Sequence, residues 1–188
     1  MPDTDLGALL LGLARAAIAH QLGLGPRPVP PPDPRLDERG ATFVTLTLDG
    51  DLRGCIGSLR RTRKLGEDVI TNAIAAASTD PRFAPLSRSE FDRVAVEVSL
   101  LSEPEFIDFD TEASLLRQIR PQTDGLILFA GCRSATFLPQ VWAQLPEPAD
   151  FLDALKRKAG LPVERPVDGL MAARYSVRKW HEPEPEPL

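Results

Sequence analysis

The chain has 188 residues, of which 43% are hydrophobic and 26% are charged. This length and composition fit one folded domain with a substantial core and exclude wholesale disorder. The formal net charge of −5 argues against a general nucleic-acid binder, which is usually basic overall. No apolar run approaches the roughly 20 residues that cross a bilayer, and no signal-peptide pattern is present, so we expect a cytoplasmic protein that does not bind membranes.

Helical and strand periodicities divide the chain into short elements. Apolar spacings of three and four predict helices, alternation with period two predicts half-buried strands, and Asp49-Gly50 is a strong hairpin signal. The predicted elements, in chain order, are a helix over 5–22, a stiff proline-rich segment over 26–34, strands over 44–48 and 52–59, a helix over 65–78, a strand over 94–101, a helix over 111–119, strands over 125–130 and 134–138, a short helix from 139, a helix over 149–159 and a strand over 171–180. Hairpins separated by helices indicate an α+β layered fold.

The predicted second strand contains Leu-Arg-Gly-Cys-Ile-Gly at residues 52–57. In an extended chain Arg53 and Cys55 share one face of the sheet. A two-residue turn before this strand would set Val44 opposite Cys55 and Leu46 opposite Arg53. The register therefore predicts the environment of the cysteine.

Two interpretations of this strand follow from its chemistry. Arg53 beside Cys55 would stabilise a thiolate, which is the form a nucleophile needs. Alternatively, Cys55 is a small buried side chain and Arg53 pairs with a carboxylate. Gly54 and Gly57 weaken a strand, so they mark a bulge or the close approach of another backbone or a ligand.

The other residues of metal and thiol chemistry are sparse. Cys55 and Cys132 cannot form a disulfide framework, and neither belongs to a CxxC motif, so both thiols are expected to stay free. His20 and His181 are isolated, which argues against a papain-like Cys-His mechanism. The sequence shows no zinc spacing and predicts no metal site, although an oxygen-only site stays open.

The hexapeptide at 52–57 is the signature of the AMMECR domain family, named after a human chromosomal region linked to Alport syndrome, and the chain resembles this family. The resemblance continues in order through further blocks at residues 80–86, 96–104, 136–142 and 155–160, and covers roughly residues 6–180. It implies a single domain over residues 1–180 with two lobes, a smaller lobe inserted in a larger one, and a cleft beside the signature strand. The Glu-Pro tail at 181–188 is expected to be disordered.

The resemblance also implies partners. Family members are candidate enzymes without an established reaction. Bacterial versions resemble the A component of the AmmeMemoRadiSam set, which includes a Memo-type protein related to non-haem iron dioxygenases and a radical SAM protein. A pathway shared with those two proteins is therefore implied, and the cofactor stays unknown.

Matched polar positions complete the candidate site. In the catalytic interpretation Cys55 is the nucleophile and Glu97 is the general base. The groups expected to bind a small anionic substrate are Arg53, Gly54, Gly57, Asp80 and Arg82. In the structural interpretation Asp80 shapes its loop and Arg82 pairs with Glu97.

The sequence thus predicts a cytosolic enzyme that performs thiol-dependent transfer or hydrolysis. The alternative is a non-catalytic module that binds a protein or a ligand through the same cleft, for example the Memo-type partner. A third interpretation uses the basic segment, defined as Arg60, Arg61, Arg63 and Lys64, as an RNA-contacting edge, where the simpler account is a solvated loop face.

Overall fold

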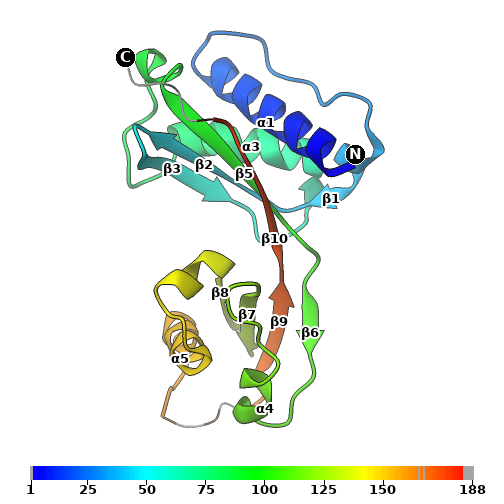
Figure 1. Ribbon diagram of the computed structural model, residues 1–188, viewed down its shortest axis with the longest axis vertical. Coiled ribbons are helices and arrows are strands. Elements are labelled where there is room, and N and C mark those ends of the chain that lie inside the picture. Colours follow the sequence, from blue (N-terminus) through cyan, green and yellow to red (C-terminus); the bar gives the residue numbers. More distant parts are fainter. Residues whose placement is uncertain (1, 165, 167, 184–188) are drawn as a thin grey trace. The chain divides into compact units, whose positions relative to one another are not determined.

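The computed structural model describes residues 2–164, 166 and 168–183 (Figure 1). Helices are combined with antiparallel sheets, so the expected α+β class is confirmed. The chain forms two compact units, one made of Met1–Leu101 with Arg178–Leu188 and the other of Ser102–Val177. No helix among the described residues is long and apolar enough to cross a membrane.

The first unit is built on a four-stranded sheet with the order β10-β5-β2-β3 (Figure 1). Strand β2 pairs antiparallel with both of its neighbours, β3 and β5. The strands are β2 (Thr42–Leu48), β3 (Asp51–Gly57), β5 (Val94–Leu101) and β10 (Val177–His181), and the long helices are α1 (Pro2–Gln21) and α3 (Leu65–Ser78). The shorter elements are α2 (Pro34–Asp37), β1 (Arg39–Gly40), β4 (Arg63–Lys64) and η1 (Arg88–Glu90).

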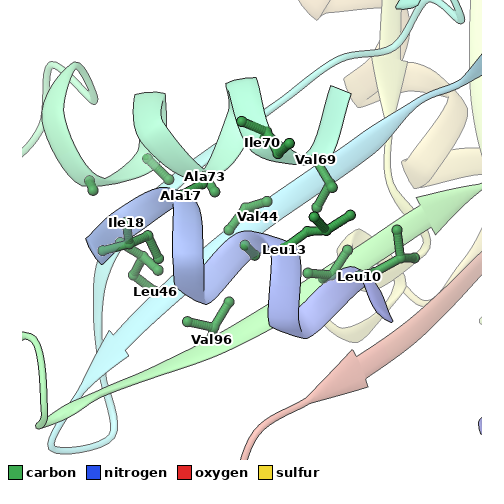
Figure 2. Close-up of a cluster of buried hydrophobic side chains, with 14 of the residues drawn as sticks. Leu10, Leu13, Ala17, Ile18, Val44, Leu46, Val69, Ile70, Ala73 and Val96 are labelled. Carbon is green, nitrogen blue, oxygen red and sulfur yellow. The ribbon is translucent and has the colours of Figure 1, made fainter. Parts of the chain in front are cut away.

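Helices α1 and α3 cover one face of this sheet and form the core with it (Figure 2). Val44 and Val96 point into this core and are fully buried, as the period of two requires. The helical stripes contribute Leu10, Leu13, Ala17 and Ile18 from α1, and Val69, Ile70 and Ala73 from α3. The opposite face, which we call the open face, therefore carries the alternating residues such as Thr45 and Glu97.

The β2–β3 hairpin contains one extra residue, Arg53. Thr47 pairs with Leu52, as a two-residue turn predicts, but Leu46 pairs with Gly54. Arg53 lies between these pairs without a partner on β2, which defines a β-bulge. The predicted register is wrong beyond this point, because a two-residue turn sets the pairing only up to the bulge.

The bulge decides which face of the sheet Cys55 occupies. Cys55 lies opposite Thr45 and not opposite Val44. Since a shift of one residue exchanges the two faces of a strand, the expected register would have placed Cys55 among the helix-facing residues. The bulge brings its side chain to the open face.

The two glycines of this strand are sites of close packing. A Cβ atom at Gly54 would lie 2.3 Å from the backbone oxygen of Ala76 in α3. A Cβ atom at Gly57 would lie 2.2 Å from the ring of Phe43. Gly54 therefore lets α3 approach β3, and Gly57 makes room for the aromatic ring across the hairpin.

The second unit has its own sheet, with the order β6-β9-β7-β8, and its own core. Its elements are β6 (Glu105–Ile107), α4 (Glu112–Leu116), β7 (Gly125–Ala130), β8 (Arg133–Phe137), η2 (Pro139–Ala143), α5 (Pro148–Lys158) and β9 (Met171–Tyr175). The ring of Trp142 stacks on that of Phe151 at 3.8 Å in this core. The fully buried Lys156 joins α5 to α4 through Glu112, with 2.9 Å between Nζ and Oε1.

The end of the chain departs from the predicted single strand over 171–180. It forms two strands, β9 and β10, which belong to different sheets. Ser176 separates them, and its carbonyl accepts a hydrogen bond of 2.9 Å from the Ser102 amide. Strand β10 reaches His181, inside the segment expected to be a disordered tail, and residues 184–188 of that tail lie outside the described residues.

Candidate functional site

Cys55 lies on an edge strand whose outer backbone groups are held by a loop. Strand β3 ends the sheet, so half of its amides and carbonyls have no strand partner. The Asp80 carboxylate accepts a 2.8 Å hydrogen bond from the Cys55 amide, and the Arg82 guanidinium donates one of 3.2 Å to the Cys55 carbonyl. Asp80 and Arg82, which follow α3, therefore fix the backbone of the cysteine from outside the sheet.

The thiol of Cys55 is half-buried and contacts the neighbouring strand. The Thr45 hydroxyl donates a hydrogen bond of 3.3 Å to Sγ. Thr45 lies directly opposite Cys55, where cross-strand Cβ atoms come within about 5 Å. This donor was missed from the sequence, because the predicted register placed Val44 at this position.

Asp80 and Arg82 form a two-pronged ion pair. Nε of Arg82 donates to Oδ1 of Asp80 at 2.9 Å, and Nη2 donates to Oδ2 at 2.7 Å. The Asp80 side chain is only 2% exposed, and the hydrogen bonds from Arg82 hold the pKa of this carboxyl far below its usual range. The hydrogen bond to Asp80 raises the pKa of Arg82, and the Cys55 thiol adds to this rise.

Arg82 is the cation that the site presents to solvent, since its side chain is 53% exposed. Its Nε and Nη2 atoms donate the hydrogen bonds to the Asp80 carboxylate and to the Cys55 carbonyl. A guanidinium carries five N–H donors, so Arg82 retains the capacity to bind an anionic group.

Arg53 serves the loop and not the thiol. Its Nε donates to Oε1 of Glu90 at 2.7 Å, and its Nη1 donates to the Ala84 carbonyl at 2.9 Å. The hydrogen bond from Arg53 lowers the pKa of Glu90 to about 2. This geometry corresponds to the structural interpretation of Arg53, in which the arginine pairs with a carboxylate. Glu90 had no signal in the sequence analysis.

Glu97 extends a polar row across the open face. It lies opposite Thr45 on β5, so Cys55, Thr45 and Glu97 occupy three adjacent strands in one row. Two strand spacings separate the first and the last by about 10 Å. Nζ of Lys179 donates to the Glu97 carboxylate at 3.0 Å, whereas Arg82, its expected partner, pairs with Asp80.

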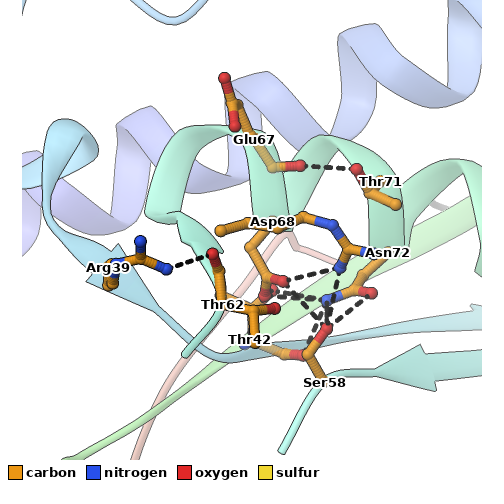
Figure 3. A network of polar contacts seen from close by, with 9 residues as sticks. Arg39, Thr42, Ser58, Thr62, Glu67, Asp68, Thr71 and Asn72 are labelled. Atoms are coloured by element: carbon orange, nitrogen blue, oxygen red, sulfur yellow. Dashed lines mark hydrogen bonds and ion pairs between the residues drawn. The ribbon is translucent and has the colours of Figure 1, made fainter. Parts of the chain in front are cut away.

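A second polar cluster of this unit, which we call the buried cluster, surrounds Asp68 (Figure 3). The fully buried Asp68 accepts hydrogen bonds of 2.8 Å from the Thr42 amide and of 2.9 Å from the Ser58 hydroxyl. The Asn72 amide donates to Asp68 and to the Thr42 carbonyl, both at 3.0 Å. This cluster joins β2, the end of β3 and α3, and its buried groups satisfy one another.

The basic segment is largely engaged in contacts within the chain. Arg63 pairs with Asp68 at 3.3 Å, and Lys64 pairs with Asp37 at 2.7 Å. Arg61 donates to a backbone carbonyl at 2.8 Å. These contacts favour the interpretation of the segment as a solvated loop face over that of an RNA-contacting edge.

The remaining candidates lie away from these clusters. Cys132 is exposed in the turn between β7 and β8. Nδ1 of His20 lies 3.2 Å from the Gly25 carbonyl at the end of α1. No group of three or more metal-ligating side chains comes together within the described part of the chain.

Comparisons with known proteins agree with this architecture. The AMMECR1 family model matches residues 11–180. A protein of Methanothermobacter thermautotrophicus is 40% identical over 183 residues, which cover 95% of each chain. Protein PH0010 of Pyrococcus horikoshii is 41% identical over 168 residues, which cover 84% of this chain and 80% of that protein. The crystal structure of PH0010, described as uncharacterized, superposes with a TM-score of 0.83 at 35% identity and covers 98% of this chain and 95% of its own.

Proposed function

This chain belongs to the AMMECR1 family, and from that premise we propose that it uses Cys55 as a reactive thiol on a small substrate that carries an anionic group. The observation that supports this most is the bulge at Arg53, because it directs Cys55 to the open face. A thiol needed only for packing would be buried most fully on the helix-covered face.

The charges around the thiol suit an anionic substrate. Arg82 is held beside Cys55 by Asp80, and half of its side chain stays exposed. A carboxylate or phosphate of the substrate would dock on this guanidinium. Glu97, about 10 Å along the row, and Lys179, which pairs with it from β10, would contact the far end of the substrate.

The reaction that follows is transfer or hydrolysis. The Cys55 sulfur attacks an electrophilic carbon of the substrate and forms a bond to it, and the leaving group departs with the bonding electron pair and takes a proton from solvent. Water or an acceptor then displaces the sulfur and regenerates the thiol. Glu97 acts on this second step or on the substrate, because a proton on the thiol lies beyond its hydrogen-bond reach.

A second candidate is a non-catalytic module that binds a ligand or a protein through the same residues. The separation between Glu97 and the thiol favours this alternative, since a base normally contacts the nucleophile it activates. In that case chemistry would come from partners, of which a Memo-type protein and a radical SAM protein are the ones implied by the family.

The proposal is tested by alkylation of the folded protein with Cys132 replaced by Ser. Neutral iodoacetamide should label Cys55 at neutral pH faster than it labels a free cysteine. Cys55 should also prefer the anionic reagent iodoacetate. The ratio of its iodoacetate rate to its iodoacetamide rate should be higher than for a free cysteine, because Arg82 attracts the anion. Arg82→Gln should reduce this preference about fivefold, which corresponds to roughly 1 kcal/mol of charge attraction at a surface.

Arg93→Gln is the matched control, because Arg93 has similar exposure and also pairs with an aspartate. It should leave both labelling rates unchanged. Slow labelling of the folded protein at every pH would contradict the thiol mechanism. A Cys55→Ser protein that still binds its Memo-type partner as the wild type does would support the module.

A further inference from the structure

We infer that Thr45 is a positioning residue for Cys55, which holds the sulfur on the open face and donates the hydrogen bond that stabilises its ionised form. This inference rests on the proposed function of Cys55 and adds the residue that controls its reactivity. It starts from the register of the hairpin, which sets Thr45 opposite Cys55, and from the 3.3 Å between Oγ1 and Sγ.

The chemistry of the two groups assigns the direction of this contact. A neutral thiol and a hydroxyl can each act as donor or acceptor. Once the thiol loses its proton, the sulfur can only accept, so the Thr45 hydroxyl must donate. A hydrogen bond made to the charged form favours that form, and Thr45 therefore increases the fraction of Cys55 that is ready to react.

Of the other polar neighbours of Cys55, Asp80 holds its backbone, Arg82 holds its backbone and also interacts with its side chain, and Glu97 has another partner. The Asp80 carboxylate accepts from the Cys55 amide, and the Arg82 guanidinium donates to the Cys55 carbonyl oxygen. Glu97, on the other side of Thr45, binds Lys179. Thr45 therefore supplies the sulfur with a neutral donor from the rigid central strand, in addition to the charge of Arg82.

The chain offers a matched control in the same strand. Thr47 lies two residues further along β2, on the same face, and is also half-buried, but its partner on β3 is Leu52. Thr45→Val and Thr47→Val make the same change in shape and polarity, and only the first removes a donor from the sulfur. Thr45→Ser keeps the donor, and Thr45→Ala removes it with less steric demand.

The experiment measures the iodoacetamide labelling rate of Cys55 against pH for these four variants in the Cys132→Ser background, with circular dichroism as a check of folding. Thr45→Val should shift the midpoint of the profile upward by about half to one pH unit. Labelling at neutral pH should become about two- to threefold slower, because a smaller thiolate fraction is partly offset by a more nucleophilic sulfur. The plateau at high pH should rise for the same reason, which a loss of packing alone would not produce.

Thr45→Ser and Thr47→Val should both follow the parent profile. If Thr45→Val does not fold, the comparison of Thr45→Ala with Thr45→Ser decides the question. A Thr45→Val or Thr45→Ala profile that superposes on a readily labelled parent would overturn the role of Thr45 and leave the proposed function intact. A parent whose Cys55 is inert at every folded pH would overturn both.

Discussion

Helix α3 carries one carboxylate near its start and another just beyond its end, and each one holds a backbone amide of the neighbouring sheet. Asp68, in the first turn, accepts from the amide of Thr42 at 2.8 Å. Asp80, after the last turn, accepts from the amide of Cys55 at 2.8 Å. The same device thus joins the helix to β2 at one end and to β3 at the other.

The two ends differ in what surrounds the carboxylate. Asp68 accepts hydrogen bonds from hydroxyl and amide groups of Thr42, Ser58 and Asn72 (Figure 3). It also pairs with the half-exposed Arg63 at 3.3 Å. Asp80 accepts from the amides of Cys55 and Arg82 and from the half-exposed guanidinium of Arg82, and Cys55 carries its thiol on the open face. The three neutral donors around Asp68 form a buried network that specifies the fold, whereas Asp80 holds the backbone of a residue whose side chain lies on the open face.

The largest expected effect tests the buried cluster around Asp68, at the start of α3. Asp68→Ala should lower the free energy of unfolding by about 3–5 kcal/mol, because it leaves the buried Thr42 amide and its hydroxyl partners without an acceptor. Denaturation by guanidinium chloride measures this change. Glu67→Gln, in the same helical turn but exposed, should change stability by less than about 0.5 kcal/mol. Equal effects at the two positions would show that the buried cluster does not stabilise the fold.

The next prediction concerns the approach of α3 to β3. Gly54→Ala should destabilise the protein by about 2 kcal/mol, because the new Cβ would lie 2.3 Å from the Ala76 carbonyl and the helix must move. Since Asp80 follows this end of the helix, the labelling rate of Cys55 should change as well. Gly12→Ala is the control, because Gly12 has open space within α1, and it should stabilise the protein by about 0.5–1 kcal/mol. A Gly54→Ala protein as stable as the wild type would disprove the close contact.

The sequence predicted the elements better than their register. The stripe of α3 gave the bounds 65–78 that the structure shows, because apolar spacing reports directly which face of a helix is buried. The pairing of β3 with β2 depends instead on where the bulge falls. Gly54 and Gly57 indicated a bulge or a close approach in this strand. Which face of the sheet Gly54 occupies depends on its contact with Ala76 in α3, and this contact joins residues that are distant in sequence.

The same limit applies to the candidate site. Asp80 and Arg82 lie beside Cys55, as we expected of these polar positions, and both contact its backbone. The expected pairing of Arg82 with Glu97 was wrong, because Arg82 binds Asp80, two residues before it in the chain. A strand face and a motif predict which residues gather, whereas tertiary packing decides which partner each side chain reaches.

The smallest expected effect concerns Asp80, after the end of α3, and is tested by the pH dependence of stability. Asp80→Asn should destabilise the protein at pH 7 by about 1 kcal/mol, because the amide oxygen can still accept from Cys55 and the lost partner, Arg82, is half exposed. The hydrogen bonds from Arg82 lower the pKa of Asp80 in the folded state, so the charged carboxylate stabilises the fold. This contribution is complete above the unfolded-state pKa of about 3.9 and is lost as the pH falls through the lower folded-state value.

The difference between wild type and Asp80→Asn in urea denaturation should therefore be constant from pH 7 to about pH 5 and should narrow below pH 4. Asp92→Asn is the control for general acid effects, since Asp92 is exposed, and its difference from wild type should stay near zero throughout. A difference for Asp80→Asn that is as large at pH 3 as at pH 7 would mean that the charge of Asp80 does not hold the loop. In that case only the hydrogen bond to the Cys55 amide would connect the end of α3 to the strand, and Arg82 would owe its position beside the thiol to its own contact with the Cys55 carbonyl.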